Sequence, residues 1–494
     1  MAGERAKVAP MVDLQRPERR SLGDVRYRHA LALKPYSGDS ARALKGLFPP
    51  TGLEYIAASM KDLVGEVTLL DLRYEKAYQD PAVLSRFIRD EIDLLCIGIQ
   101  WSSGFKSICE FIGRLPPEVV TVVGGQKATE EVDTLFERCP NIDMVVRGEG
   151  EEIIRQVAAG VPKSEIRGLS YRENGRVVHN ENQDLPEIAS LPFPDRGLRR
   201  HDYRLIKSGV QLSRRRFDTV LTTRGCPFTC KFCTFSLNPL GQKRNYTERS
   251  VESVIEELKA IEADVVLFSD DNLFTNPKRS ERLLDRIIAN GIKKSFIAQT
   301  RIDIAKYPDL LGKAQEAGFK VLLIGLESPH DRILTQLHKG ITQQQIREAF
   351  EVLSRFDFYV HGYFIYGNIG ETDEEMMYIP EFAREIGVDS ISFQKLRIER
   401  FSPLKELVDA TPGYYYKRIG GAVYSPGHGR REMKRIRNRI RAKFYDVPHI
   451  LHMIRKALRI GLIDKGDIAY LLFKLPAIVS LMLKRGRRRV RKNG

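Results

Sequence analysis

Cysteine is scarce in this chain, and tryptophan is nearly absent. The 494 residues include six cysteines and one tryptophan. Six cysteines, three of them bunched, do not resemble the disulfide framework of a secreted protein. We therefore expect a reducing, cytoplasmic location. No cysteine follows Cys233, so any metal centre that needs a later cysteine is excluded.

Long hydrophobic runs are also missing. The opening residues, MAGERAKVAPMVDLQRPERR, contain no apolar stretch of the length that a signal peptide needs. The one long apolar run, IAYLLFKLPAIVSLML at 468–483, is interrupted by Lys474 and Pro476. It is shorter than the ~20 residues that span a bilayer. A membrane-spanning helix is not expected.

The charge is unbalanced, with 80 lysines and arginines against 64 acidic residues and a net charge of +16. The excess gathers at 16–20 (RPERR), 429–443 (GRREMKRIRNRIRAK) and 484–492 (KRGRRRVRK). Basic segments of this kind meet anionic lipid, nucleic acid or solvent. The hydrophobic content of 42% is that of a globular protein with a substantial core.

Short apolar runs alternate with helical stretches in the first third of the chain. Five of these runs are strand candidates, at 25–35, 66–73, 93–100, 119–126 and 142–151. Near-continuous apolar strands are typical of a parallel sheet that helices cover on both faces. The pattern predicts a flavodoxin-like, doubly wound parallel sheet.

A doubly wound sheet binds its ligand beyond the carboxyl ends of its strands. That rule groups the residues that follow the predicted strands: Tyr36, Trp101, Ser102, Ser103, Gly124, Gly125, Gln126, Gly148, Glu149 and Gly150. Each glycine alone could simply turn the chain. Their shared position after successive strands favours a crevice for a bulky ligand.

The alternation resumes after a proline-rich linker. Asn174-Gly175 between two alternating runs predicts a hairpin. Six further strand candidates begin at DTVLTT and end at SISFQKLR, with helices between them. This second alternation predicts a (β/α)6 partial TIM barrel, whose chemistry lies where strands end. After about residue 402 the sequence predicts a helical, basic C-terminal region.

These patterns divide the chain into five parts. We expect a basic extension, a flavodoxin-like domain, a hairpin with a linker, a partial barrel and the C-terminal region, at 1–24, 25–165, 166–210, 211–402 and 403–494.

The cysteine-rich stretch RGCPFTCKFC follows the first barrel strand. Cys226, Cys230 and Cys233 have the spacing C-x3-C-x2-C. A structural zinc site prefers four ligands, and an incomplete zinc site or a disulfide loop is the alternative. Cys96, Cys109 and Cys139 lie in ordinary strand, helix and loop contexts. Three cysteines suit a [4Fe–4S] cluster that keeps one iron open.

This loop resembles the cluster loop of the radical S-adenosylmethionine (radical SAM) enzymes. The resemblance implies that SAM binds the open iron and is cleaved to a 5′-deoxyadenosyl radical. It also implies SAM contacts by residues after successive barrel strands: Phe232, Asp270, Asp271, Asn272, Gln299, Arg301 and Glu327. A later stretch, FIYGNIGET, departs from the family pattern because Ile369 replaces a proline.

The first half extends the resemblance to the cobalamin-binding radical SAM enzymes. It carries PPTGLEYIAASM, VVGG and VRGEGE and ends in SLPFPDR. The resemblance implies that the predicted crevice holds cobalamin. There is no D-x-H-x-x-G motif, so no histidine is offered as a lower cobalt ligand.

The function implied is that of a radical SAM enzyme that transfers methyl from methylcobalamin to an unactivated carbon of a lipid-like or other small molecule. A radical oxidative cyclase or carbon–carbon coupling enzyme, as in the anaerobic Mg-protoporphyrin ester cyclases, is the alternative. A cobalamin-binding sensor with a non-catalytic cluster is the alternative from another class. The chemistry requires a one-electron reductant of the flavodoxin or ferredoxin type.

The C-terminal region has two equal interpretations. An amphipathic segment with basic flanks can lie on the inner face of the cytoplasmic membrane, or it can cap the barrel. A nucleic-acid partner is not expected, because the basic residues are not interleaved with aromatic ones.

Overall fold

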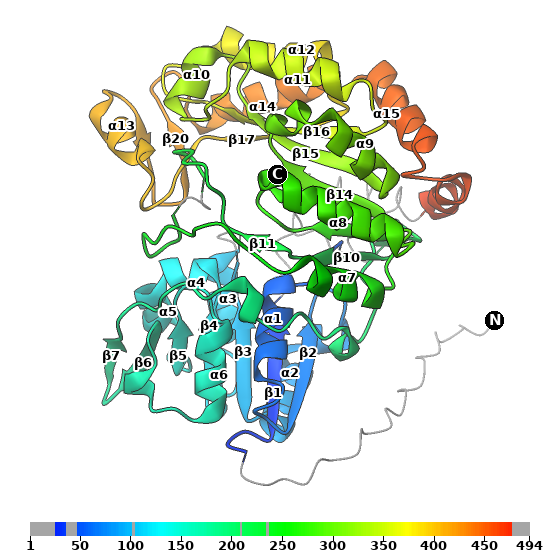
Figure 1. Ribbon diagram of the computed structural model, residues 1–494. Coiled ribbons are helices and arrows are strands. Elements are labelled where there is room, and N and C mark those ends of the chain that lie inside the picture. The colour runs from blue at the N-terminus through cyan, green and yellow to red at the C-terminus, as the bar shows by residue number, and fades with distance from the viewer. Residues whose placement is uncertain (1–24, 36–46, 101–103, 208–209, 234–236, 477–494) are drawn as a thin grey trace, which may run out of the picture.

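The computed structural model describes residues 25–35, 47–100, 104–207, 210–233 and 237–476. Two domains lie one above the other (Figure 1), with the first, blue-to-cyan sheet below the green-to-orange one.

The first domain is a seven-stranded sheet of order β2-β1-β3-β4-β5-β6-β7. Five strands are parallel, namely β1 (His29–Lys34), β2 (Glu66–Asp71), β3 (Leu94–Gly98), β4 (Val120–Gly124) and β5 (Met144–Val146). The order 2-1-3-4-5 is that of flavodoxin, as predicted. The predicted hairpin is present as β6 (Leu169–Glu173) and β7 (Arg176–His179), and it extends this sheet antiparallel to β5. Asn174 and Gly175 both have positive φ, as its two-residue turn requires.

Helices cover both faces of this sheet. They are α1 (Thr51–Met60), α2 (Pro81–Glu91), α3 (Phe105–Ile112), α4 (Gln126–Glu130), α5 (Val132–Arg138) and α6 (Glu151–Ala159). Apolar side chains of α2, α3 and α5 pack in one core, and those of α1 and α6 pack in another on the opposite face. Because both faces are buried, the central strands can be apolar throughout.

The linker contains only short elements, namely η3 (Ile188–Ser190), η4 (Arg196–Leu198), β8 (Ile206–Lys207) and β9 (Val210–Gln211). Two further short helices, η1 (Ala77–Gln79) and η2 (Lys163–Glu165), belong to the first domain. The linker contacts both domains, since Arg199 pairs with Glu54 of α1 and with Asp218 of the second domain.

The second domain is a six-stranded parallel sheet of order β10-β13-β14-β15-β16-β17. Its strands are β10 (Phe217–Val220), β13 (Val265–Phe268), β14 (Ser295–Thr300), β15 (Phe319–Glu327), β16 (Tyr359–Tyr366) and β17 (Ser390–Lys395). The helices between them are α7 (Val251–Ala260), α8 (Pro277–Ala289), α9 (Pro308–Glu316), α10 (Asp331–Gln336), α11 (Gln343–Leu353) and α12 (Asp373–Glu385), with η5 (Leu273–Thr275) and η6 (Ile302–Lys306). The predicted partial barrel is confirmed.

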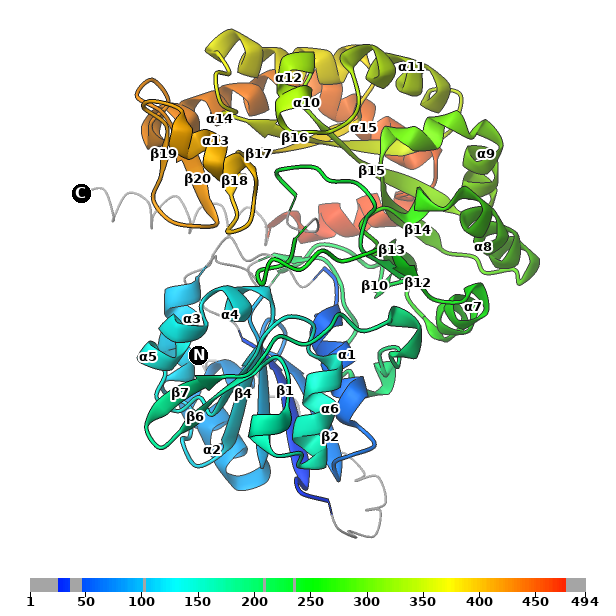
Figure 2. The ribbon, with the colours of Figure 1, turned by 60° about the vertical axis from the view of Figure 1, so that its left-hand side comes forward.

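The C-terminal region is helical, as predicted, with α13 (Leu404–Ala410), α14 (Arg430–Phe444) and α15 (Val447–Arg459). It also contains two short strands, β19 (Tyr415–Tyr416) and β20 (Gly421–Tyr424), and β18 (Arg397–Ile398) lies just before it. These three strands form a small antiparallel sheet beyond β17 (Figure 2). Two-residue strands leave too short an alternation to be detected in a sequence.

Candidate functional site: a cysteine loop between two domains

The cysteine loop begins directly after β11 (Thr223–Arg224), which pairs with β12 (Thr247–Glu248). Gly225 makes the turn into the loop at φ 83°, and a Cβ there would meet the carbonyl oxygen of Asn245 at 2.4 Å. Only glycine fits this close approach of two backbones. Cys230 is buried and Cys226 and Cys233 are half-buried. Burial raises the pKa of the Cys226 thiol.

Three thiols on one loop are a donor set that suits an iron–sulfur cluster. No disulfide joins any of the six cysteines, all of which the structure describes. Each cysteine of a [4Fe–4S] cluster binds a different iron. Cys226, Cys230 and Cys233 are the residues that would hold the cluster.

Two neighbouring segments hold the loop in place. The backbone N–H of Lys231 donates to the carbonyl oxygen of Leu337 at 3.0 Å. His338 Nδ1 lies 3.1 Å from Oγ1 of Thr229. From the C-terminal side, Ser402 Oγ donates to the carbonyl oxygen of Lys231 at 2.6 Å. These partners could not be singled out from the sequence, because they come from loops with no recognisable spacing.

The three residues after β13 have different environments. Asp270 is fully buried, and its Oδ1 accepts hydrogen bonds from Oγ1 of Thr222 and Thr223 at 2.7 and 2.5 Å. It therefore ties together the ends of neighbouring strands, whereas we expected a SAM contact. Asp271 is half-buried. Its burial, and to a lesser extent the negative charge of Asp270, raise the pKa of its carboxyl group to about 6. Asn272 is 5% exposed, and its Oδ1 has no hydrogen-bond partner among the described residues.

The remaining predicted SAM contacts come from β14, β15 and the loop itself. Gln299 is half-buried near the end of β14. Glu327 ends β15 with a φ of 65°, rare for a residue other than glycine. Its Oε1 lies 2.9 Å from Nζ of Lys339, and both side chains are buried. The same Nζ lies 5.8 Å from the ring centroid of Phe232. Lys339 thus links two predicted contacts, although the sequence did not indicate it.

Arg301 points at the cysteine loop. It follows β14 and is 7% exposed. Its Nη1 donates to Sγ of Cys230 at 3.8 Å, and its guanidinium carbon lies 3.8 Å from the ring centroid of Phe228.

The predicted cobalamin contacts lie at the carboxyl edge of the first sheet. Gly124 ends β4, and Gln126 begins α4. Gly125 has a φ of 101°, and a Cβ there would meet the carbonyl oxygen of Ile99 at 2.6 Å. The close packing of Gly125 against the residue that follows β3 is therefore enough to require glycine, with or without a ligand. Gly148 also has positive φ and faces Leu240 of the second domain. The predicted contacts Tyr36, Trp101, Ser102 and Ser103 lie outside the described residues.

Glu149 has protein partners where we expected a corrin contact. Its carboxylate lies 2.6 Å from Nη1 of Arg224 and 3.3 Å from Nε of Arg244. Arg224 also pairs with Glu151. The GEGE stretch therefore holds the base of the cysteine loop. The one sequence feature that could have indicated this pairing is the arginine directly before Gly225 and Cys226.

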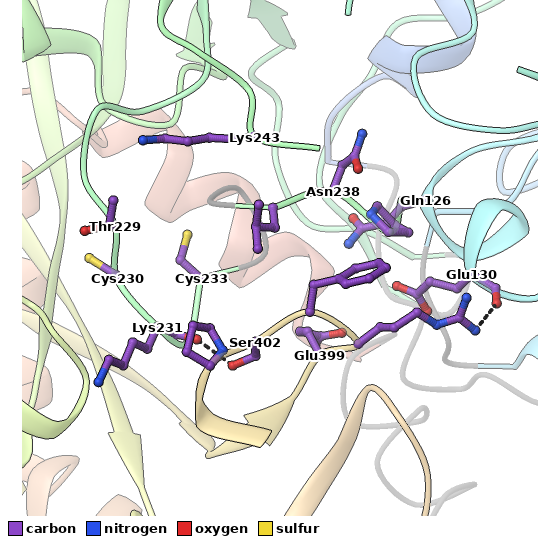
Figure 3. A pocket seen from close by; sticks show the side chains of 15 residues that line it. Gln126, Glu130, Thr229, Cys230, Lys231, Cys233, Asn238, Lys243, Glu399 and Ser402 are labelled. Carbon is purple, nitrogen blue, oxygen red and sulfur yellow. Dashed lines mark hydrogen bonds between the residues drawn. The ribbon is translucent and has the colours of Figure 1, made fainter. Parts of the chain in front are cut away.

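A cavity of about 200 Å³ connects the cysteine loop with the edge of the first sheet. Cys230, Cys233 and Lys231 lie on one side, and Gln126 and Glu130 lie on the other (Figure 3). The remaining wall comes from two segments: Leu237, Asn238, Pro239 and Lys243, and Glu399, Arg400, Phe401, Ser402 and Pro403. Of the predicted cobalamin contacts, Gln126 lines this space. Its position at the edge of the sheet fits a cobalamin bound next to the residues that would hold the cluster.

Comparison with known proteins decides the family. Residues 220–383 match the radical SAM superfamily, and residues 41–158 match the B12 binding domain. The uncharacterized methyltransferase PH0819 of Pyrococcus horikoshii is 31% identical over 375 residues, which cover 74% of this chain and 79% of that protein. The chain belongs to the cobalamin-binding radical SAM family. The predicted cofactors, a [4Fe–4S] cluster, SAM and cobalamin, are those of this family.

Two further relatives have names that indicate different activities. The anaerobic magnesium-protoporphyrin IX monomethyl ester cyclase of Synechocystis is 26% identical, covering 65% of this chain and 64% of that protein. The hopanoid C-3 methylase of Methylococcus capsulatus is 25% identical, covering 61% of this chain and 58% of that protein. The chain thus spans less than two thirds of the length of these two relatives.

The solved structures agree on the fold. The radical SAM methyltransferase TsrM of Kitasatospora setae, solved with cobalamin and a [4Fe–4S] cluster, superposes with a TM-score of 0.63. The two proteins are 17% identical, and the match covers 81% of this chain and 79% of TsrM.

Proposed function

We propose that this radical SAM enzyme transfers a methyl group to an unactivated carbon of a lipid-like or other small molecule. The observation that carries the proposal is the shared cavity, which places Cys230 and Cys233 opposite Gln126 at the edge of the cobalamin domain. When bound, the cluster with SAM supplies hydrogen abstraction from carbon, and cobalamin supplies a methyl group. A substrate carbon bound between the two cofactors would be within reach of both.

The chain's own residues would bind and shield the reactants. Asp271 and Asn272 follow β13, and Gln299 lies near the end of the adjacent β14. Together they offer oxygen and amide groups for the amino group and ribose of SAM. Phe232 offers an aromatic face for the adenine. Leu237, Pro239, Phe401 and Pro403 give the cavity an apolar wall, which would exclude water from a reactive carbon centre.

The test is anaerobic turnover with SAM labelled in its methyl group, offered with candidate lipids and porphyrins. We expect the label in the product, detected by mass spectrometry. An oxidised or cyclised product without label would contradict methyl transfer and support the cyclase alternative, which the Synechocystis relative favours. No release of 5′-deoxyadenosine from fully iron-loaded protein would support the sensor alternative.

The electron donor for the cluster is part of this proposal. We infer that a one-electron donor of the flavodoxin or ferredoxin type reduces the cluster. Those donors are acidic, and this chain carries a net charge of +16, which favours their encounter. Reduction by flavodoxin that slows steeply as salt is added would support this pairing, and a salt-independent rate would contradict it.

We also propose that the C-terminal region rests on an anionic membrane surface. Within the described residues, no helix has both the length and the apolarity needed to cross a bilayer. Two helical segments nevertheless expose apolar side chains. These are Val447, Ile450, Leu451 and Ile454 on α15, and Leu471, Leu472, Phe473 and Leu475 on the helical segment at 465–476. Arg455, Lys465 and Lys474 lie on the same helices. Apolar residues with basic neighbours suit an interface of anionic lipid.

Vesicle sedimentation tests this surface. The full chain should co-sediment with vesicles that contain anionic lipid, and less with zwitterionic ones. Replacing Leu472 and Phe473 by aspartate should abolish sedimentation. The control is Val83→Asp, since Val83 is 45% exposed on α2 of the other domain. Equal loss in the control, or no loss in the double variant, would contradict the proposal.

A further inference from the structure

The guanidinium of Arg301 lies against the cysteine loop on two sides. It stacks on Phe228 with 3.8 Å between the guanidinium carbon and the ring centroid. Phe228 lies between the first two cysteines of the loop. Such a short cation–π contact is favourable where water is excluded, and Arg301 is 7% exposed. The stack therefore fixes the position of the loop between Cys226 and Cys230.

Each of the three guanidinium nitrogens has an acceptor within the protein. Nη1 donates to Sγ of Cys230 at 3.8 Å, Nη2 to the carbonyl oxygen of Lys339 at 2.8 Å, and Nε to Oδ2 of Asp303 at 3.0 Å. Arginine recognises a free carboxylate best through two nitrogens at once. Here three of the five N–H groups of the guanidinium, one on each nitrogen, are engaged by protein acceptors, and one N–H on each of Nη1 and Nη2 remains. These three contacts hold the guanidinium against the cysteine loop.

The contact with Cys230 has an electronic consequence. When an iron–sulfur cluster takes up an electron, the negative charge on its sulfur ligands increases. A hydrogen bond to a ligand sulfur, and a nearby positive charge, stabilise the reduced form and raise the reduction potential. Arg301 supplies both from one side chain.

We propose that Arg301 is a positioning residue of the cluster, which holds the loop through Phe228 and Cys230 and raises the cluster's reduction potential. This assignment differs from the SAM contact that the family resemblance implies for Arg301. It rests on the proposed cluster at Cys226, Cys230 and Cys233.

The test compares Arg301→Met and Arg301→Lys with wild type after anaerobic reconstitution. Arg279→Lys is the matched control, because Arg279 is equally buried and its Nη2 donates to the backbone carbonyl of Arg249. The cluster's midpoint potential is read from dithionite titration followed by electron paramagnetic resonance. SAM affinity is measured separately by equilibrium binding.

We expect a lower midpoint potential in Arg301→Met, a smaller decrease in Arg301→Lys and none in Arg279→Lys. The dissociation constant of SAM should change by less than about threefold, since the proposal assigns Arg301 to the cluster loop and not to SAM. Loss of iron from Arg301→Met with an unchanged circular dichroism spectrum would also support the holding role.

An unchanged potential together with SAM binding weakened by about tenfold or more, the size of a lost charge-assisted hydrogen bond, would overturn the inference. Failure of wild-type protein to assemble any cluster would instead contradict the proposed function. The two failures are therefore distinguishable.

Discussion

Arg224 joins the two domains at the base of the cysteine loop, with its Nη1 2.6 Å from Oε2 of Glu149. The pair is almost excluded from solvent, at 15% and 22% exposure of the two side chains. Arg224 belongs to β11, one residue before the turn at Gly225, whereas Glu149 follows β5 of the other domain. A shift of either domain would therefore displace the first cysteine.

Replacing Arg224 by methionine should destabilise the protein strongly. Glu149 and Glu151 would lose their shared partner, and a buried pair broken from one side costs about 3–5 kcal/mol. Burial already raises the pKa of Glu149. Without Arg224, Glu149 would keep only Arg244, at 3.3 Å, as a cationic partner. The measurement is the free energy of unfolding in urea. It is compared among wild type, Arg224→Met and the triple variant Arg224→Met, Glu149→Gln, Glu151→Gln.

The triple variant should recover part of the lost stability, because it removes the uncompensated charges. The matched control is Arg28→Met, whose pair with Asp93 is exposed, with 76% of the Arg28 side chain accessible. An exposed pair contributes about 0–1 kcal/mol. Equal effects at Arg224 and Arg28 would show that the interdomain pair does not hold the domains together.

Each of the three loop cysteines should be required for iron. Reconstituted wild type should carry about four irons per chain. Replacing Cys226, Cys230 or Cys233 by alanine should lower the iron content and abolish cleavage of SAM. Cys96→Ala is the control, since Cys96 is buried within β3 and should leave iron unchanged. Full iron in a Cys233→Ala variant would exclude that residue as a ligand.

Much of the fold could be predicted from the sequence, because the central strands of both sheets are parallel. Short apolar runs separated by helices mark such strands, as in HALALK at 29–34, where Ala30–Leu33 are all fully buried. The cysteine loop could be placed for the same reason, since it follows the first barrel strand. The hairpin at Asn174-Gly175 was predictable because its turn needs two residues with positive φ.

The partners of the site residues could not be predicted. Whether Asp270 faces a cofactor or the hydroxyls of Thr222 and Thr223 depends on the orientation of a side chain, which adjacent positions in a sequence do not distinguish. Likewise, Glu149 meets Arg224 across 75 residues of chain. Such contacts come from tertiary packing and have no local period.

Arg199 in the linker should be sensitive even to a conservative change. It donates to both carboxylate oxygens of Glu54, at 2.6 and 2.8 Å, and to both of Asp218, at 2.7 and 2.8 Å. A lysine has no planar fork and cannot make both bidentate pairs. Arg199→Lys should therefore lower the free energy of unfolding, measured by urea denaturation, by about 2–4 kcal/mol, since two buried carboxylates lose hydrogen bonds.

The neighbouring Arg200 provides the comparison for this prediction. Its side chain is 34% exposed, and its Nε lies 3.5 Å from Oε1 of Glu75. Arg200→Lys should therefore change the free energy of unfolding by less than about 1 kcal/mol. A similar loss in both variants would mean that the linker responds to any change, and that bidentate pairing by Arg199 is not the cause.

His361 should make the stability depend on pH in a defined window. It lies in β16 with Nδ1 2.7 Å from Oγ of Ser390, and burial lowers its pKa from 6.5 to about 4. Because the folded state disfavours the protonated ring, the stability contribution is complete above pH 6.5 and is lost as the pH falls towards 4. The loss amounts to at most about 3 kcal/mol. In His361→Gln, the urea midpoint should fall less between pH 7 and pH 4.5 than it does in wild type. Parallel pH profiles for the two proteins would show that the ring is protonated in the folded state without cost.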